Sequence, residues 1–280
     1  MASYLRPTSI QHALEALAAQ PRTILAGGTD HYPARTLHEP PEDILDISAL
    51  DGLRQIARVD HHWRIPALAT WTDLIDHRLP TLFDGLKAAA SQIGGRQIQN
   101  AGTIAGNLCN ASPAADGIPP LLALDAAVEL RSAATSRVLP LSDFILGPRH
   151  TARRPDELLT AILIPHLEAI STFEKLGARK YLVISITMVA TTIATDPAGR
   201  IVHAAIAVGA CGPVATRLPA LEAALLGNLP SPGLLQAHHL APLHPIDDLR
   251  APAAYRLQAT LELLRRALTP AQSLARSLAA

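Results

Sequence analysis

The chain has 280 residues, of which 49% are hydrophobic and 17% charged, and its 24 basic residues balance 24 acidic ones. These values fit one large or two medium globular domains and exclude a disordered chain. No segment carries the basic excess of a nucleic-acid binder, and an aromatic content of 3% argues against a stacking platform for single strands.

Short buried elements are predicted for the first third of the chain. Thr8 or Ser9 can cap a helix that runs to about Ala19, because apolar residues recur along one face of it. A buried strand at 23–26 leads directly into the pair Gly27-Gly28. The next predicted elements are a strand at 44–47, a hairpin of 56–59 with 63–68, and a helix at 82–93 that Gly94-Gly95 ends.

Residues 94–120 are crowded with Gly, Asn, Ser, Asp and Pro, and no regular element is predicted there. Long irregular segments inside compact domains tend to be functional, so this stretch is a candidate site. The chain then returns to regular structure, with a helix at 121–124, strands at 127–131 and 136–139, and a strand within 156–165.

After about His166 the pattern changes, and we predict a domain boundary near residue 168, dividing the chain into 1–167 and 168–280. The second part is predicted to hold a strand or strand–helix–strand group, a loop rich in Pro and His, and a final helix. Their ranges are 173–176, 181–195 and 201–209 for the group, 230–245 for the loop and 253–268 for the helix.

The first segment that can carry chemistry follows the strand at 23–26. Consecutive glycines at 27 and 28 can adopt positive φ and let the backbone approach a ligand closely. Successive N–H groups in such a turn form an anion-binding concavity, and Thr29 adds a hydroxyl donor. The spacing matches neither a dinucleotide GxGxxG nor a GxxxxGK phosphate loop. On spacing alone, a plain strand-to-helix turn is the favoured interpretation, since Gly-Gly turns are common.

The second such segment runs from Gly102 to Asn107 and continues through small residues to Asp116. Its two glycines flank a donor-rich turn, and small side chains leave room for a bulky planar ligand. Asp116 could accept hydrogen bonds from sugar hydroxyls, or could cap the helix near 119–124. Two donor-rich loops far apart in sequence suggest the two ends of one elongated anionic ligand.

These motifs together resemble one family, the FAD-binding medium subunit of the molybdenum hydroxylases of the xanthine dehydrogenase and aerobic carbon monoxide dehydrogenase group. The resemblance covers nearly the whole chain in order. It implies an α+β fold, in which a two-part FAD-binding domain of the vanillyl-alcohol-oxidase (PCMH) type precedes a smaller α+β C-terminal domain. The matching segments are 26–30, 41–47, 97–107, 111–116, 158–165, 173–175, 208–217 and 247–256.

The resemblance also implies which residues contact FAD. The first loop would wrap the diphosphate, the second would make the next phosphate and ribityl contacts, and Lys175 would lie near the flavin ring, where a cation stabilises reduced anionic flavin. A solvated strand lysine is the alternative for Lys175. The implied set is Leu25, Ala26, Gly27, Gly28, Thr29, Asp30, His31, Ile93, Gly102, Thr103, Ile104, Ala105, Gly106, Asn107, Asp116, Leu159 and Lys175.

Three positions depart from the family pattern. His31-Tyr32 replaces two aliphatic residues, Pro66 replaces a glycine, and Ala105 stands where glycine is usual. A polar or aromatic side chain is therefore expected beside the cofactor at 31–32.

The expected role is electron transfer within a larger enzyme. Two cysteines, Cys109 and Cys211, cannot supply the ligands of an iron–sulfur cluster, so no catalytic or metal-binding residue is predicted in this chain. The family implies a large partner with the molybdenum cofactor and a small partner with [2Fe-2S] clusters, as a dimer of heterotrimers. A cytoplasmic location without a membrane span is expected.

Two other functions stay open at this point, a free-standing FAD oxidase or dehydrogenase of a small molecule and a scaffold that has lost the cofactor. His61-His62 and His238-His239 are interpreted as solvated turn histidines, because adjacent residues do not easily chelate one ion. Cys109 is interpreted as a space-filling residue.

Overall fold

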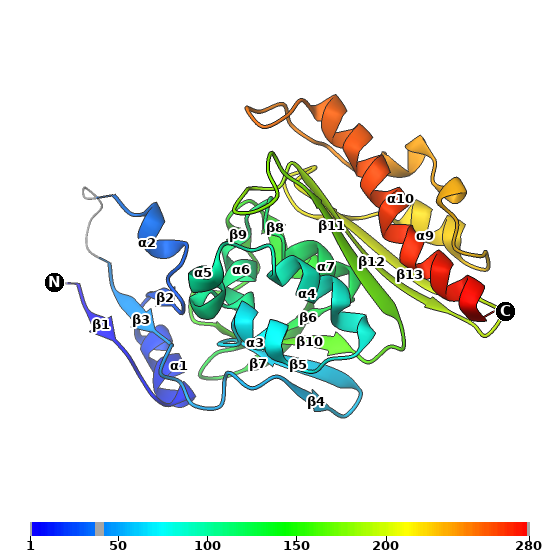
Figure 1. Ribbon diagram of the computed structural model, residues 1–280. Coiled ribbons are helices and arrows are strands. Elements are labelled where there is room, and N and C mark those ends of the chain that lie inside the picture. The colour runs from blue at the N-terminus through cyan, green and yellow to red at the C-terminus, as the bar shows by residue number, and fades with distance from the viewer. Residues whose placement is uncertain (1, 37–41, 279–280) are drawn as a thin grey trace.

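The computed structural model describes residues 2–36 and 42–278. Pro41, at the start of the motif 41–47, lies outside the described residues. Figure 1 shows the three larger sheets in succession along the molecule, with the N-terminal end at one side and the C-terminal helix at the other. Among the described residues no helix combines the length and apolar character that crossing a bilayer requires.

The N-terminal unit is a small parallel sheet with a helix packed on it. Ser9 caps the first helix by accepting a hydrogen bond from the N–H of His12, and Leu14 and Leu17 are buried on its inner face. The strand order is β1-β3-β2. The elements are β1 (Tyr4–Leu5), α1 (Ile10–Ala19), β2 (Thr23–Leu25), α2 (His31–Ala34) and β3 (Ile44–Asp46).

The middle unit is a five-stranded antiparallel sheet in the order β4-β5-β10-β6-β7, with short helices on it. The predicted hairpin is present, although His62 begins its second strand instead of lying in the turn. The elements of the middle unit are β4 (Ala57–Val59), β5 (His62–Pro66), α3 (Trp71–Asp76), η1 (Thr81–Phe83), α4 (Asp84–Ala90), β6 (Ala127–Arg131), β7 (Ser136–Pro140), α8 (Leu141–Phe144), β8 (Ile145–Gly147), β9 (His150–Thr151) and β10 (Leu158–Pro165).

The prediction that 94–120 lacks regular structure is wrong. The segment folds into α5 (Arg96–Ala101), α6 (Ile104–Asn110) and the start of α7 (Ile118–Ala123). Glycine and asparagine lower the helix propensity of these turns, but burial of Ile104 and Leu108 overrides it. Three short helices therefore present the small residues that the sequence places there.

The C-terminal unit is a four-stranded antiparallel sheet in the order β11-β12-β13-β14. Figure 1 shows α10 along one face, and α4 and α7 of the middle unit pack on the other. Residues 187–194 of the central strand are accordingly all buried. The elements are β11 (Ile170–Leu176), β12 (Thr187–Thr195), β13 (Ile201–Gly209), β14 (Thr216–Arg217), α9 (Pro219–Leu225), η2 (Pro232–Leu234), η3 (Ala237–Leu240) and α10 (Ala253–Leu278).

Several other predictions need correction. Residues 181–186 form a loop before β12, which starts at Thr187, and Tyr181, Leu182 and Ile184 of this loop are exposed. The helix at 82–93 divides into η1 and α4, and the loop 230–245 contains η2 and η3. His239 is buried and its Nδ1 accepts the N–H of Gln236, so it is not a solvated histidine. The last helix extends ten residues beyond 268, to Leu278.

Candidate functional site

The first glycine loop leaves β2 with its backbone donors unused. Gly28 has φ +67°, a conformation that other residues adopt at a cost. Among the described residues, the N–H groups of 27–31 donate to no protein acceptor. The loop is half-buried except at Asp30. Five successive N–H groups that no protein acceptor uses form a row of donors suited to an anionic ligand.

The second loop lies directly against the first. A Cβ at Gly27 would overlap the carbonyl oxygen of Ala101, and a Cβ at Gly102 would lie 3.3 Å from Oγ1 of Thr29. The close approach of these two segments, about 75 positions apart, therefore requires glycine at position 27 and leaves little space at position 102. The sequence prediction that the two loops act on one ligand has its geometric basis here.

Thr103 organises the second loop. Its hydroxyl accepts the N–H of Gly106 at 3.0 Å and so caps α6. The N–H groups of Thr103 and Ala105 donate to no acceptor among the described residues. Oδ1 of Asn107 is buried and likewise has no hydrogen-bond partner there. A buried polar atom without a partner is costly, so this set of groups is suited to a polar ligand.

Asp116 does not cap the following helix, whose N-cap is Gly117. Its carboxylate instead accepts from Nζ of Lys175 at 2.5 Å and from Oγ of Ser185 at 2.5 Å. Burial raises the pKa of the Asp116 carboxyl, while the Lys175 ammonium and the Ser185 hydroxyl act in the opposite direction. This buried pair joins the middle unit to the C-terminal sheet.

Lys175 is thus not a solvated strand lysine. Its side chain is 5% exposed, and Nζ also donates to the carbonyl of Val183 at 3.0 Å. An ammonium compensated by a carboxylate at this distance exerts a weaker field on its surroundings than an isolated cation.

The remaining expected residues lie around the two loops or in the core. Leu159 of β10 is 2% exposed and belongs to the hydrophobic core of the middle unit, and the half-buried Ile93 packs against the same core. His31 opens α2, and its Nε2 lies 3.1 Å from Oε1 of Glu42. Leu25 ends β2, and Ala26, Gly27, Gly28, Thr29 and Asp30 form the first loop. Gly102 and Thr103 lie between α5 and α6, and Ile104, Ala105, Gly106 and Asn107 belong to α6.

Three residues at this site were missed by sequence reasoning. Trp71 is 2% exposed, and its ring packs against the backbone at Gly102 and Gly117. The ring therefore supports the second loop. Ser185 binds Asp116, and Arg149 binds Asp30. The capping pattern Thr70-x-x-Asp73 locates the helix that begins at Trp71. No signal in the sequence indicates which segment packs against the ring of Trp71.

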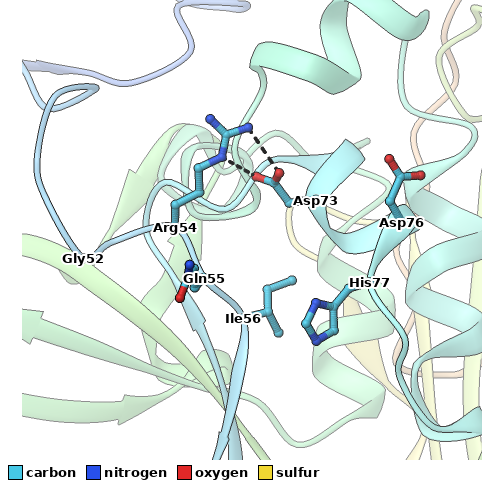
Figure 2. Close-up of a pocket in the computed structure, with 7 residues that line it drawn as sticks. All are labelled: Gly52, Arg54, Gln55, Ile56, Asp73, Asp76 and His77. Carbon is cyan, nitrogen blue, oxygen red and sulfur yellow. Dashed lines mark hydrogen bonds and ion pairs between the residues drawn. The ribbon is translucent and has the colours of Figure 1, made fainter.

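A separate pocket lies away from the two loops. It has a volume of about 930 Å³ and lies between residues 52–56 and α3 (Figure 2). Arg54 crosses it to Asp73 through hydrogen bonds of 2.9 and 3.1 Å. No residue of either loop lines it. Arg54 and Asp73 already pair with each other, and Asp76 lies 3.8 Å from Arg96, so we assign the pocket no ligand. Within the described residues no cluster of three or more His, Cys, Asp or Glu could hold a metal ion.

Comparison with known proteins matches two family descriptions. Residues 1–167 match the FAD binding domain in molybdopterin dehydrogenase, and residues 172–271 match the CO dehydrogenase flavoprotein C-terminal domain.

Individual relatives agree with these matches. The chain is 35% identical to the nicotinate dehydrogenase FAD-subunit of Eubacterium barkeri, over 74% of this chain and 72% of that one. It is 32% identical to the carbon monoxide dehydrogenase medium chain of Afipia carboxidovorans, over 98% of each. A solved structure, reconstituted CO dehydrogenase from Oligotropha carboxidovorans, superposes with a TM-score of 0.90 at 28% identity, covering 98% of each chain.

Proposed function

The chain belongs to the family of FAD-binding medium subunits of molybdenum hydroxylases, and we propose from this that its two adjacent loops hold one FAD for electron transfer within a larger enzyme. FAD, when bound, supplies the redox chemistry that the side chains of this protein lack. The relatives are subunits of dehydrogenase complexes, which favours this function over a free-standing oxidase.

The residues present fit FAD. The N–H groups of 27–31, with those of Thr103 and Ala105, provide a row of donors suited to a diphosphate. The unpartnered Oδ1 of Asn107 can accept from a ribityl hydroxyl. This run of unused donors, brought together by the contact of Gly27 with Ala101, is the observation that carries the proposal.

The residues that lie outside the two loops then support them. Trp71, which the sequence did not predict, packs against the second loop, and the expected pair Asp116–Lys175 fixes the C-terminal sheet beside it. Ile93 and Leu159 contribute through the core on which the loops are built. The chain orients the cofactor and excludes water from it, which are the contributions expected of a flavoprotein.

The complex is expected to contain a large molybdenum subunit and a small subunit with [2Fe-2S] clusters. The relatives named as medium chains and FAD subunits support such partners. A dimer of heterotrimers, a cytoplasmic location and a domain boundary at residue 168 belong to the same proposal.

Purification of the tagged chain from its native cells tests the assignment to a complex. We expect flavin, molybdenum and iron to co-purify in constant ratio with two further polypeptides, and metal analysis with flavin extraction measures this. Recovery of the chain alone, loaded with flavin and free of both metals, would instead favour the free-standing oxidase.

A further inference from the structure

Arg149 joins three segments of the site that are far apart in sequence. It lies in the turn between β8 and β9, and its Nη1 donates to Oδ2 of Asp30 at 2.7 Å. The same nitrogen donates to Oδ1 of Asn110 at the end of α6. Its backbone N–H donates to the carbonyl of Ala111 at 3.0 Å. One residue thus ties the first loop to the helix that the second loop begins.

The backbone at this junction is strained on both sides. Ala111 has φ +46° and Arg149 has φ +59°, in the left-handed region that residues other than glycine enter at a cost of about 1–2 kcal/mol each. Such conformations persist where the surrounding structure requires them. Here the two strained residues are hydrogen-bonded to each other, and Arg149 is thereby directed toward Asp30.

The ion pair does little for the stability of the whole fold. The side chains of Arg149 and Asp30 are 60% and 52% exposed, and an ion pair so exposed contributes little to folding. Its local effect is different, because Asp30 lies within the run of unused N–H groups and Asn110 ends α6. Fixing both side chains fixes the spacing of the two loops.

We propose that Arg149 is a positioning residue of the FAD site, acting through Asp30 and Asn110 to hold the two loops at the separation that fits one diphosphate. This inference rests on the proposed function of the loops. We call the contacts of Arg149 with Asp30 and Asn110 the clamp. A pre-formed site loses less conformational entropy on binding, so the clamp strengthens FAD binding without contacting the flavin ring.

Titration of the FAD-free full chain with FAD tests the clamp. Arg149→Met should weaken binding about tenfold, which corresponds to about 1.4 kcal/mol, while the melting temperature of the FAD-free protein stays that of the wild type. Arg149→Lys should recover part of the loss. Arg266→Met is the matched control, because it breaks the ion pair with Glu262 at a similarly exposed arginine on α10, away from both loops, and should bind FAD normally.

A double-mutant cycle with Asp30→Asn distinguishes an effect of Arg149 that acts through Asp30 from a general loss of folded structure. If Arg149 acts through Asp30, the double variant binds FAD only slightly more weakly than Arg149→Met alone. Unchanged affinity in Arg149→Met, fully additive losses, or an equal fall in stability without FAD would each overturn the inference. A wild-type chain that binds no FAD would instead refute the proposed function itself.

Discussion

Replacement of Lys175 by methionine is expected to lower the free energy of unfolding by about 3–5 kcal/mol at neutral pH, because it leaves the buried carboxylate of Asp116 without its cation. Both side chains are less than a tenth exposed, so water cannot replace the ammonium. For a protein of this size the loss corresponds to a fall of about 6–20 °C in melting temperature, which calorimetry measures.

The loss should also depend on pH. Burial already favours the protonated form of Asp116 and raises its pKa. Without the ammonium this preference grows, so the variant loses stability as the pH rises and approaches the wild type on acidification. The double variant Asp116→Asn, Lys175→Met should recover most of the stability, since neither buried charge is left. The exposed Lys180→Met serves as the control. A pH-independent loss would contradict a buried charge as its cause.

Replacement of Gly27 by alanine is the second large expected effect. The added methyl group would occupy the position of the Ala101 carbonyl and force the two loops apart. Overpacking of this kind costs about 1–3 kcal/mol. Because the loops must be close together to bind FAD, this cost destabilises the FAD-bound form relative to the FAD-free form. FAD affinity should therefore drop about 10- to 100-fold, which fluorescence titration of the apoprotein measures.

Gly95 provides the control for this substitution. A Cβ there would make only ordinary contacts, at 3.6 Å from its nearest neighbours, and the backbone is not in the left-handed region. Gly95→Ala should therefore bind FAD as the wild type does. Equal affinities for Gly27→Ala and the wild type would mean that the contact between the loops does not shape the cofactor site.

Features set by local sequence could be predicted here. The glycine pair at 27–28 and the donor-rich segment from Gly102 are recognisable because their chemistry is contained in a few neighbouring residues. The strand 201–209 was predicted for the same reason, since it has a continuous apolar pattern. The family resemblance then joined the two loops into one site and supplied the fold.

Features set by tertiary contacts could not be predicted. The short helix α6 forms because Ile104 and Leu108 pack into the core that contains Trp71, against its own propensity. The carboxylate of Asp116 meets Lys175 across 59 positions, and Arg149 meets Asp30 across 119. Contacts between residues so far apart in the chain produce no recognisable pattern in the local sequence.

The apolar residues of 181–186 were misassigned for a related reason. Their composition suits a strand, but Lys175 binds the carbonyl of Val183 and Ser185 binds Asp116. These contacts hold the segment as a loop, with Tyr181, Leu182 and Ile184 exposed. Hydrophobicity alone does not distinguish such a segment from a buried strand.

Binding of FAD to the isolated full-length chain tests the central claim most directly. Isothermal titration of the FAD-free protein should give one FAD per chain, with a simultaneous change in the visible absorption bands of the flavin. Free riboflavin, which lacks the diphosphate and adenosine, should bind far more weakly because the two loops recognise the phosphates. Absence of FAD binding by the folded chain, or equal affinity for riboflavin, would contradict the assignment of the two loops.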